Sequence, residues 1–306
     1  MKKKVFLTRT LHDFALKELK KRYQIEVHSG KIPIPQTKLR SKIKEIDGLI
    51  CFPYDTINEE TIDLAKNLKV ISTYSVGFDH IDTKYAKKKK IRVGYTPEVL
   101  TDATADLAFS RLIDIVRRVS EGDRIIREGK WKVIYGAYDY VGLDLQDKTL
   151  GILGLGRIGG TLAKRAKAFD MKVIGMRRSA EPVEHVDQMV DRKGLNTLLS
   201  NSDYVVVTLP LTTETHHMFG KEQFSQMKET AFFINIGRGQ TTDTNALMEA
   251  LHEQQIAGAG LDVFEEEPLP PEHSLWEMEN IIITPHTSGS TMYYNDRVMK
   301  IFLPNL

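Results

Sequence analysis

The glycine-rich segment at positions 154–159, GLGRIG, constrains the fold of this chain more than any other feature. A predicted strand, Thr149–Leu153, precedes it, and a predicted helix at 157–169 leads into a second strand at 172–176. In such a unit the first glycine makes a tight turn, the second lets the backbone approach a pyrophosphate, and the third lets the helix pack on the strand. The helix N-terminus then offers N–H groups to the phosphates. The pattern predicts a dinucleotide-binding α/β domain rather than a plain glycine-rich turn.

Strand and helix patterns alternate along most of the chain, which predicts parallel strands joined by helical crossovers. The 306 residues fit two domains of about 150 residues each. The first block has predicted strands at 5–8, 24–28, 48–52, 70–75 and 92–95, and predicted helices at 11–22, 39–46, 59–68 and 83–90. The second block has predicted strands at 149–153, 172–176, 204–208, 232–236, 259–263 and 281–284.

Two Thr-Pro pairs, at 96–97 and 284–285, mark the ends of these blocks. Proline fixes φ and favours extended geometry before it, so both pairs are predicted hinges. Between the blocks, residues 101–128 are predicted to form one long helix, with Thr101 as its N-cap and Gly129 as its stop. The aromatic segment at 130–146 is predicted to be a loop with a functional or interface role.

Composition excludes several classes of protein. With 43 Lys and Arg against 41 Asp and Glu, the net charge of +2 argues against a nucleic-acid partner. No stretch approaches the ~18 apolar residues of a membrane span, and the apolar run after the basic N-terminus is too short for a signal peptide. The single cysteine, Cys51, cannot form an internal disulfide or a zinc cluster. We therefore expect a cytoplasmic protein with no metal site, and Cys51 as a buried core thiol.

The residues after the second strand of the nucleotide unit bear on the choice of cofactor. An NAD site usually places an acid there to bind the ribose 2′-hydroxyl. This chain has Arg177, Arg178 and Ser179 instead. Two guanidinium groups and a hydroxyl suit a 2′-phosphate, which an acid would repel. The sequence predicts that NADP(H) is preferred and that NAD(H) is the alternative.

Polar residues also follow the later strands of the second block. Arg238 comes after the 232–236 strand, Asp262 and Glu267 follow the next strand, and His286 follows the last one. Taken singly, Arg238 is explained by a surface ion pair, Glu267 by a solvated acid and His286 by a loop histidine. Together, at one edge of a sheet where ligands bind, they match the needs of carbonyl reduction. Histidine donates a proton to the oxygen, a carboxylate orients the imidazole, and arginine binds a substrate carboxylate.

Several segments together resemble the D-2-hydroxyacid dehydrogenases, specifically their glyoxylate/hydroxypyruvate reductase branch. The resemblance covers nearly the whole chain. It rests on 75–82 (SVGFDHID), 96–106 (TPEVLTDATAD), 154–159 (GLGRIG), 234–239 (INIGRG), 261–268 (LDVFEEEP) and 285–286 (PH).

The resemblance implies a full set of site residues. The catalytic residues would be Arg238, Glu267 and His286, and the N–H groups of Val76 and Gly77 would hold the substrate carboxylate together with Arg238 and His286. Leu100 and Thr104 would touch the nicotinamide, and Asp262 would hold its carboxamide. The implied cofactor-binding residues are Leu100, Thr104, Gly154, Gly156, Arg157, Ile158, Gly159, Arg177, Arg178, Ser179, Thr208, Leu209, Pro210, Thr215, Asn235, Ile236, Gly237, Asp262, His286, Ser288 and Gly289. Where the family commonly has an apolar residue, then Gly or Ala, then Ser, this chain has Thr-Ser-Gly at 287–289, so the backbone contact to the carboxamide is expected to be shifted.

The resemblance also implies the architecture: two Rossmann-like, doubly wound parallel-sheet domains with an active-site cleft between them. Residues 1–98 plus 288–306 would form a flavodoxin-like, substrate-binding domain, and residues 99–287 the dinucleotide-binding Rossmann domain. Members of the family are usually homodimers through the long helix and the loop after it, and they usually continue past the position of Leu306.

The expected activity is NADPH-dependent reduction of glyoxylate or hydroxypyruvate to the D-2-hydroxyacid. One alternative is an NAD-dependent dehydrogenase of another substrate. The residues at 177–179 disfavour D-lactate, and the length of 306 residues disfavours phosphoglycerate, because long forms of that enzyme carry an extra regulatory domain. Another is a non-catalytic nucleotide-sensing protein, which the lack of long disordered flanks disfavours. Turnover of a 2-oxoacid distinguishes these alternatives.

Overall fold

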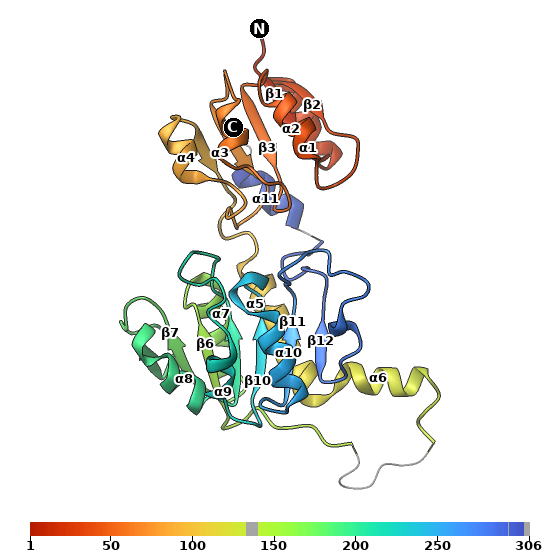
Figure 1. Cartoon of the computed structure of the whole chain (residues 1–306), viewed down its shortest axis with the longest axis vertical. Helices are drawn as coiled ribbons and strands as arrows, with labels where there is room; N and C mark the ends of the chain where they lie inside the picture. The colour runs from red at the N-terminus through yellow and green to blue at the C-terminus, as the bar shows by residue number, and fades with distance from the viewer. Residues whose placement is uncertain (133–139, 293, 303–306) are drawn as a thin grey trace. The chain divides into compact units, whose positions relative to one another are not determined.

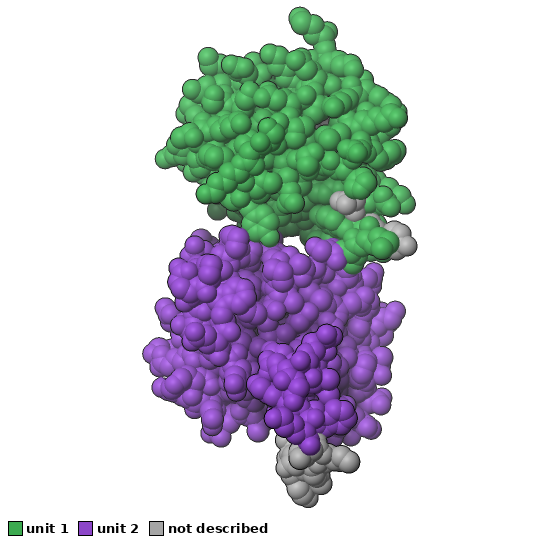
Figure 2. All heavy atoms as spheres, turned by 90° about the vertical axis from the view of Figure 1, so that its right-hand side faces the viewer, with its two compact units in different colours: residues 1–100, 291–306 green, residues 101–290 purple. Residues whose placement is uncertain are grey.

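The computed structural model describes residues 1–132, 140–292 and 294–302. The chain divides into two compact units, residues 1–100 with 291–306 (unit 1) and residues 101–290 (unit 2), coloured separately in Figure 2. Each unit has its own parallel sheet, so the expectation of two parallel-sheet α/β domains is confirmed. The division points lie two and three residues after the predicted boundaries at 98 and 287.

Unit 1 is built on a five-stranded sheet in the order β2-β1-β3-β4-β5, with every neighbouring pair parallel. Its strands are β1 (Lys4–Leu7), β2 (Gln24–Val27), β3 (Gly48–Cys51), β4 (Val70–Thr73) and β5 (Arg92–Gly94). Its helices are α1 (Asp13–Arg22), α2 (Gln36–Lys42), α3 (Glu59–Asp63), α4 (Thr83–Lys88) and α11 (Tyr294–Phe302). Val298 and Phe302 of α11 are buried against Val5 and Leu7 of β1, which is why the end of the chain belongs to this unit.

Unit 2 is built on a seven-stranded sheet in the order β12-β11-β10-β9-β6-β7-β8, again with parallel pairs. Its strands are β6 (Thr149–Leu153), β7 (Lys172–Met176), β8 (Gln188–Val190), β9 (Tyr204–Val207), β10 (Phe232–Asn235), β11 (Gly258–Leu261) and β12 (Ile281–Ile283). Its helices are α5 (Thr101–Arg117), α6 (Val119–Arg127), α7 (Arg157–Lys167), α8 (Leu195–Asn201), α9 (Lys221–Ser225) and α10 (Thr244–His252), with short 3₁₀ turns at Arg192–Gly194, Gly239–Thr241 and Ser274–Trp276. Strand order reverses at β6, and ligands of such sheets bind at that switch point.

Helices cover both faces of the unit 2 sheet (Figure 1), so a central strand such as β9 is buried at every position. On one face α5 and α7 pack through Leu112 and Leu162. On the other, α8, α9 and α10 pack through Leu198, Phe224 and Leu247. These two layers fix the carboxyl ends of the strands, which Arg238, Asp262 and His286 follow.

The long predicted helix at 101–128 is wrong as a single element. It breaks at Arg118, which has a φ of +56°, into α5 and α6. The Asp114 carboxylate accepts hydrogen bonds from the Ser120 N–H and hydroxyl, both at 2.7 Å, and so turns the chain there. Thr101 is the first helical residue rather than a cap. Gly129 does end α6, with a φ of +67° and its N–H bonded to the Ile126 carbonyl at 3.0 Å.

The remaining predicted boundaries are close to the observed ones, except in two helices of unit 1. Helix α2 begins three residues earlier than predicted, directly after Pro35, and ends at Lys42 rather than at 46, and α3 ends at Asp63 rather than at 68. Strand β8 was not predicted, because it is only three residues long and partly exposed. Part of the predicted aromatic loop, 133–139, lies outside the described residues. None of the described helices is long and apolar enough to cross a membrane.

Candidate active site

The glycine-rich loop joins β6 to α7 and has the geometry that its sequence predicts. Gly154 has a φ of +101°, and a Cβ built on it would lie 2.9 Å from the Thr208 hydroxyl. A Cβ on Gly159 would lie 2.2 Å from the Gly154 carbonyl oxygen, so this glycine allows α7 to pack on the loop. Gly156, the N-cap of α7, has nothing within 4 Å of such a Cβ. The loop is therefore open only at its second glycine, which fits the approach of a dinucleotide pyrophosphate.

Two threonines predicted to contact the cofactor brace the loops around this site. The Thr208 hydroxyl donates a hydrogen bond to the Gly154 carbonyl at 2.5 Å. The Thr215 hydroxyl donates to the Pro210 carbonyl at 2.7 Å and accepts from the Thr212 N–H at 2.8 Å, which closes the turn after β9. Each hydroxyl has one proton to donate, so both protons are used within the protein.

The three residues predicted to hold a 2′-phosphate lie together after β7. The Arg177 Nε donates to the Ser179 hydroxyl at 3.3 Å, and Arg178 is exposed. A fourth member of this cluster, Glu181, was not predicted; it forms an ion pair with Arg177, with Oε2 3.1 Å from Nη2. The signal available in the sequence was an acid four positions after this arginine.

Arg238 lies in the tight turn that follows β10, and Asn235 holds that turn. The buried Asn235 amide accepts from the Gly237 N–H at 3.0 Å and donates to the Arg238 carbonyl at 3.1 Å. Leu209 lies close to this turn, since a Cβ on Gly237 would meet its carbonyl oxygen at 2.5 Å. The predicted cofactor residue Asn235 thus has a structural task, which is to present Arg238 at the strand end.

Asp262 is fully buried at the end of β11, and its carboxylate holds the segment that carries His286. It accepts hydrogen bonds from the Thr284 hydroxyl at 2.6 Å, the Thr287 N–H at 2.9 Å and the Ser288 N–H at 2.8 Å. His286 lies between these anchor points with a φ of +49°, a conformation that is costly for a residue with a Cβ. Asp262 therefore stabilises the backbone conformation that places His286.

Glu267 and His286 are brought together, 19 positions apart in sequence. His286 Nδ1 lies 2.7 Å from Glu267 Oε2, and the other carboxylate oxygen accepts from the Phe264 N–H at 2.9 Å. The side chains are 27% and 18% exposed. A largely buried carboxylate held by a backbone N–H fixes the orientation of the imidazole beside it.

The turn of Arg238 packs on the turn of Glu267. A Cβ on Gly239 would meet the Phe264 carbonyl carbon at 1.9 Å, and the Gln240 amide donates to the Glu265 carbonyl at 2.7 Å. Strands β10, β11 and β12 are neighbours, so the groups that follow them share one edge of the sheet. An arginine and a histidine–glutamate pair at one edge can bind an anion and move a proton.

In unit 1, Val76 and Gly77 lie in the loop after β4. Within the described part of the chain no backbone carbonyl accepts from either N–H group. The Gly77 carbonyl accepts from the Ser75 hydroxyl at 2.6 Å, and Ser75 in turn lies 2.6 Å from the Thr73 hydroxyl. His80 Nε2 lies 3.0 Å from the same Thr73 hydroxyl. This buried chain of hydroxyl groups, which the sequence analysis missed, holds the loop conformation.

The other predicted contacts have the following positions. Leu100 ends the turn before α5, and Thr104 is buried in α5. Arg157 and Ile158 open α7, Ile236 donates its N–H to the Val207 carbonyl, and Ser288 and Gly289 follow His286.

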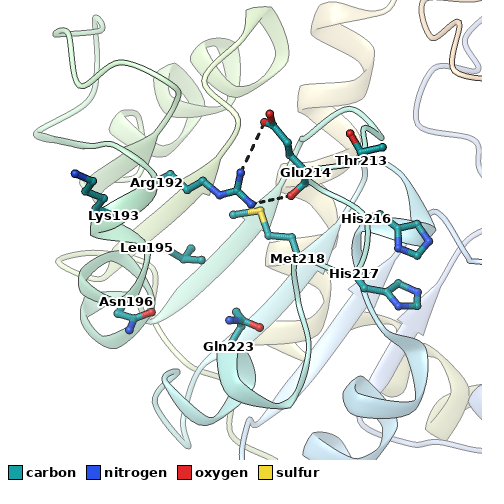
Figure 3. Close-up of a pocket in the computed structure, with 10 residues that line it drawn as sticks. All are labelled: Arg192, Lys193, Leu195, Asn196, Thr213, Glu214, His216, His217, Met218 and Gln223. Atoms are coloured by element: carbon teal, nitrogen blue, oxygen red, sulfur yellow. Dashed lines mark hydrogen bonds and ion pairs between the residues drawn. The ribbon is translucent and has the colours of Figure 1, made fainter.

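Unit 2 also has an open polar hollow of about 510 Å³ beside the turn after β9 (Figure 3). Arg192 crosses it to Glu214, with a hydrogen bond of 2.9 Å to the Glu214 carbonyl. On the side away from Arg192, the rings of His216 and His217 stack with their centroids 4.2 Å apart. None of the predicted site residues lines it.

Comparison with known proteins agrees with this geometry. The family described as D-isomer specific 2-hydroxyacid dehydrogenase, NAD binding domain, matches residues 109–288. The glyoxylate reductase of Pyrococcus horikoshii is 42% identical, over 100% of this chain and 92% of that protein. A solved structure of a Thermus thermophilus protein has a TM-score of 0.88 at 42% identity, covering 97% of this chain and 93% of that chain.

A second solved structure has a TM-score of 0.85 at 27% identity and covers 98% of this chain and 91% of that chain. It is the NADPH-dependent glyoxylate/hydroxypyruvate reductase of Sinorhizobium meliloti in complex with NADP and malonate. The family match spans more than half of this chain, and the glyoxylate reductase match spans all of it. The chain therefore belongs to the D-isomer specific 2-hydroxyacid dehydrogenase family, and within that family its similarity is to the glyoxylate reductase branch.

Proposed function

We propose that this protein reduces glyoxylate and hydroxypyruvate to the corresponding D-2-hydroxyacids, preferring NADPH, with His286 as the proton donor. The observation that carries the proposal is the 2.7 Å contact between His286 Nδ1 and Glu267. This pair lies at the carboxyl edge of a sheet whose first loop fits a dinucleotide. The glyoxylate reductase relatives support the choice of a small 2-oxoacid as substrate.

A bound nicotinamide would supply the hydride for this reaction. Glu267 accepts a hydrogen bond from the Nδ1–H of His286, and its negative charge lies beside the ring when the imidazole is protonated. The imidazolium can then release a proton from Nε2 to the carbonyl oxygen of the substrate. Asp262 keeps the loop of His286 in place while the imidazole changes its charge.

The substrate has a carboxylate beside the reacting carbonyl. We propose that Arg238 binds this group, since a guanidinium pairs with a carboxylate through two parallel hydrogen bonds. The N–H groups of Val76 and Gly77 would complete the binding of the same anion. The hydrogen bond from the Ser75 hydroxyl to the Gly77 carbonyl supports this role, because it fixes the loop that carries both N–H groups.

The preference for NADPH is supported by Arg177, Arg178 and Ser179 after β7. The Sinorhizobium relative, which is NADPH-dependent and was solved with NADP, supports the same choice. NADH is the alternative cofactor.

We also propose that the protein is a homodimer of the cytoplasm. Helix α6 extends away from the sheet of unit 2 (Figure 1), and none of its residues is buried. Val119 and Ile126 are more than half exposed on it, as is Trp131 just beyond. A second copy of the chain would cover these apolar side chains. Sedimentation equilibrium distinguishes a dimer, with twice the chain mass of 34.8 kDa, from a monomer.

The test of the activity is the loss of reduced-nicotinamide absorbance with glyoxylate or hydroxypyruvate, run in parallel with NADPH and NADH. We expect turnover with both substrates and a higher kcat/KM for NADPH. His286→Asn should lower kcat by about 10²–10⁴-fold and retain NADPH binding. His252→Asn, a matched change at an exposed histidine of α10, should retain full activity. Nucleotide binding without turnover of any 2-oxoacid would instead favour the sensing role.

A further inference from the structure

The ion pair after β7 bears on how strongly the protein distinguishes its two cofactors. Arg177 Nη2 lies 3.1 Å from Glu181 Oε2, and the Ser179 hydroxyl lies 3.4 Å from the same oxygen. Two of the three groups that would hold a 2′-phosphate are therefore already in contact with a carboxylate. Arg178 is exposed and forms no ion pair within the described residues.

We propose that Glu181 is a specificity-determining residue, which competes with the 2′-phosphate of NADPH for Arg177 and so limits the preference for NADPH over NADH. This inference rests on the proposed function, because it assumes that the adenosine ribose binds at the end of β7.

The competition follows from the chemistry of the guanidinium group. Arg177 uses Nε and Nη2 for Ser179 and Glu181, which is the edge that would receive two phosphate oxygens. A 2′-phosphate has to displace the carboxylate, or bind beside it against like-charge repulsion. The ribose of NADH carries a hydroxyl there, which can donate a hydrogen bond to Glu181 as it does to the acid of other NAD sites.

In this proposal Glu181, five positions after the last residue of β7, takes the role of the acid that the strand end lacks. The pair is accessible to solvent, since the Arg177 and Glu181 side chains are 35% and 74% exposed. Exposed pairs are weak and exchange partners easily, so the carboxylate weakens NADPH binding without preventing it. The structure therefore favours an enzyme with a modest NADPH preference that also uses NADH.

The experiment is a fluorescence titration of the full-length protein with NADPH and with NADH, in the absence of substrate. Glu181→Gln keeps the size of the side chain and removes its charge. We expect the ratio Kd(NADH)/Kd(NADPH) to rise by about three- to tenfold, with NADPH bound more tightly and NADH less tightly. Glu181→Ala should shift the ratio in the same direction.

Glu184→Gln is the matched control. It makes the same change of charge three positions away, at a side chain that is 87% exposed and pairs with His185 rather than Arg177. It should leave the ratio unchanged.

The outcomes separate this inference from the proposed function. If both nucleotides bind the unaltered protein and Glu181→Gln leaves the ratio unchanged, the inference is wrong and the proposed function stands. The inference is equally wrong if Glu184→Gln shifts the ratio as much, or if Glu181→Ala has no effect. If neither nucleotide binds the unaltered protein, the proposed function itself fails, and the inference with it.

Discussion

Two serines of unit 1 should respond in opposite ways to replacement by alanine. Ser75, 6% exposed, donates a hydrogen bond to the Gly77 carbonyl and contacts the Thr73 hydroxyl, both at 2.6 Å. Ser72, on β4, is fully buried, and its hydroxyl has no hydrogen-bond partner among the described residues. The same chemical change therefore removes a satisfied hydroxyl at one position and an unsatisfied one at the other.

The magnitudes follow from these contacts. Ser75→Ala loses two hydrogen bonds worth about 0.5–1.5 kcal/mol each, so the free energy of unfolding of unit 1 should fall by about 1–3 kcal/mol. Ser72→Ala removes a buried polar group whose desolvation costs about 1–3 kcal/mol, so stability should stay level or rise. Ser75→Ala should also raise the KM for glyoxylate, because the loop of Val76 and Gly77 loses its support.

The assay is urea unfolding followed by far-UV circular dichroism, because the two tryptophans, Trp131 and Trp276, both belong to unit 2. Steady-state kinetics of the same variants give the KM. Equal destabilisation by the two substitutions would show that hydrogen bonding of these hydroxyls does not set the stability of unit 1. An unchanged KM in Ser75→Ala would refute the link between Ser75 and the substrate loop.

Three further predictions concern buried groups. Asp262→Asn should cost about 1–3 kcal/mol of unfolding free energy in unit 2, because the Thr287 and Ser288 N–H groups bond different carboxylate oxygens and an amide has only one oxygen. It should also lower kcat more than NADPH affinity, and normal stability by tryptophan fluorescence would contradict this prediction. Cys51 should react with a maleimide only after urea is added, because it is buried and burial raises the pKa of its thiol. Rapid labelling of the native protein would contradict this prediction. Gly159→Ala should destabilise unit 2 and weaken NADPH binding, because the new methyl group would meet the Gly154 carbonyl oxygen. Gly160→Ala has open space around its methyl group, so thermal unfolding should show it to be neutral or stabilising by up to about 1 kcal/mol.

Sequence patterns predicted the periodic part of the structure well. Strands such as β6 and β9 are buried on both faces, so their apolar runs are continuous and easy to recognise. The glycine loop was equally clear, because a positive φ at Gly154 and a backbone contact at Gly159 each exclude a side chain. The break at Arg118 was not predictable, since it depends on a hydrogen bond between Asp114 and Ser120 within an otherwise continuous helical pattern.

The sequence by itself determined the fold class, the nucleotide loop and the residue types at the strand ends, because local periodicity and glycine sterics operate over a few residues. Only the tertiary structure decided how the polar side chains pair. It joined Glu267 to His286, Asp262 to the loop of His286, and Glu181 to Arg177. It also showed that Thr208 and Asn235 support loops around the site. Hydrogen bonds between groups brought together by strand order and tight turns depend on ångström-scale placement, which no pattern of residue types specifies.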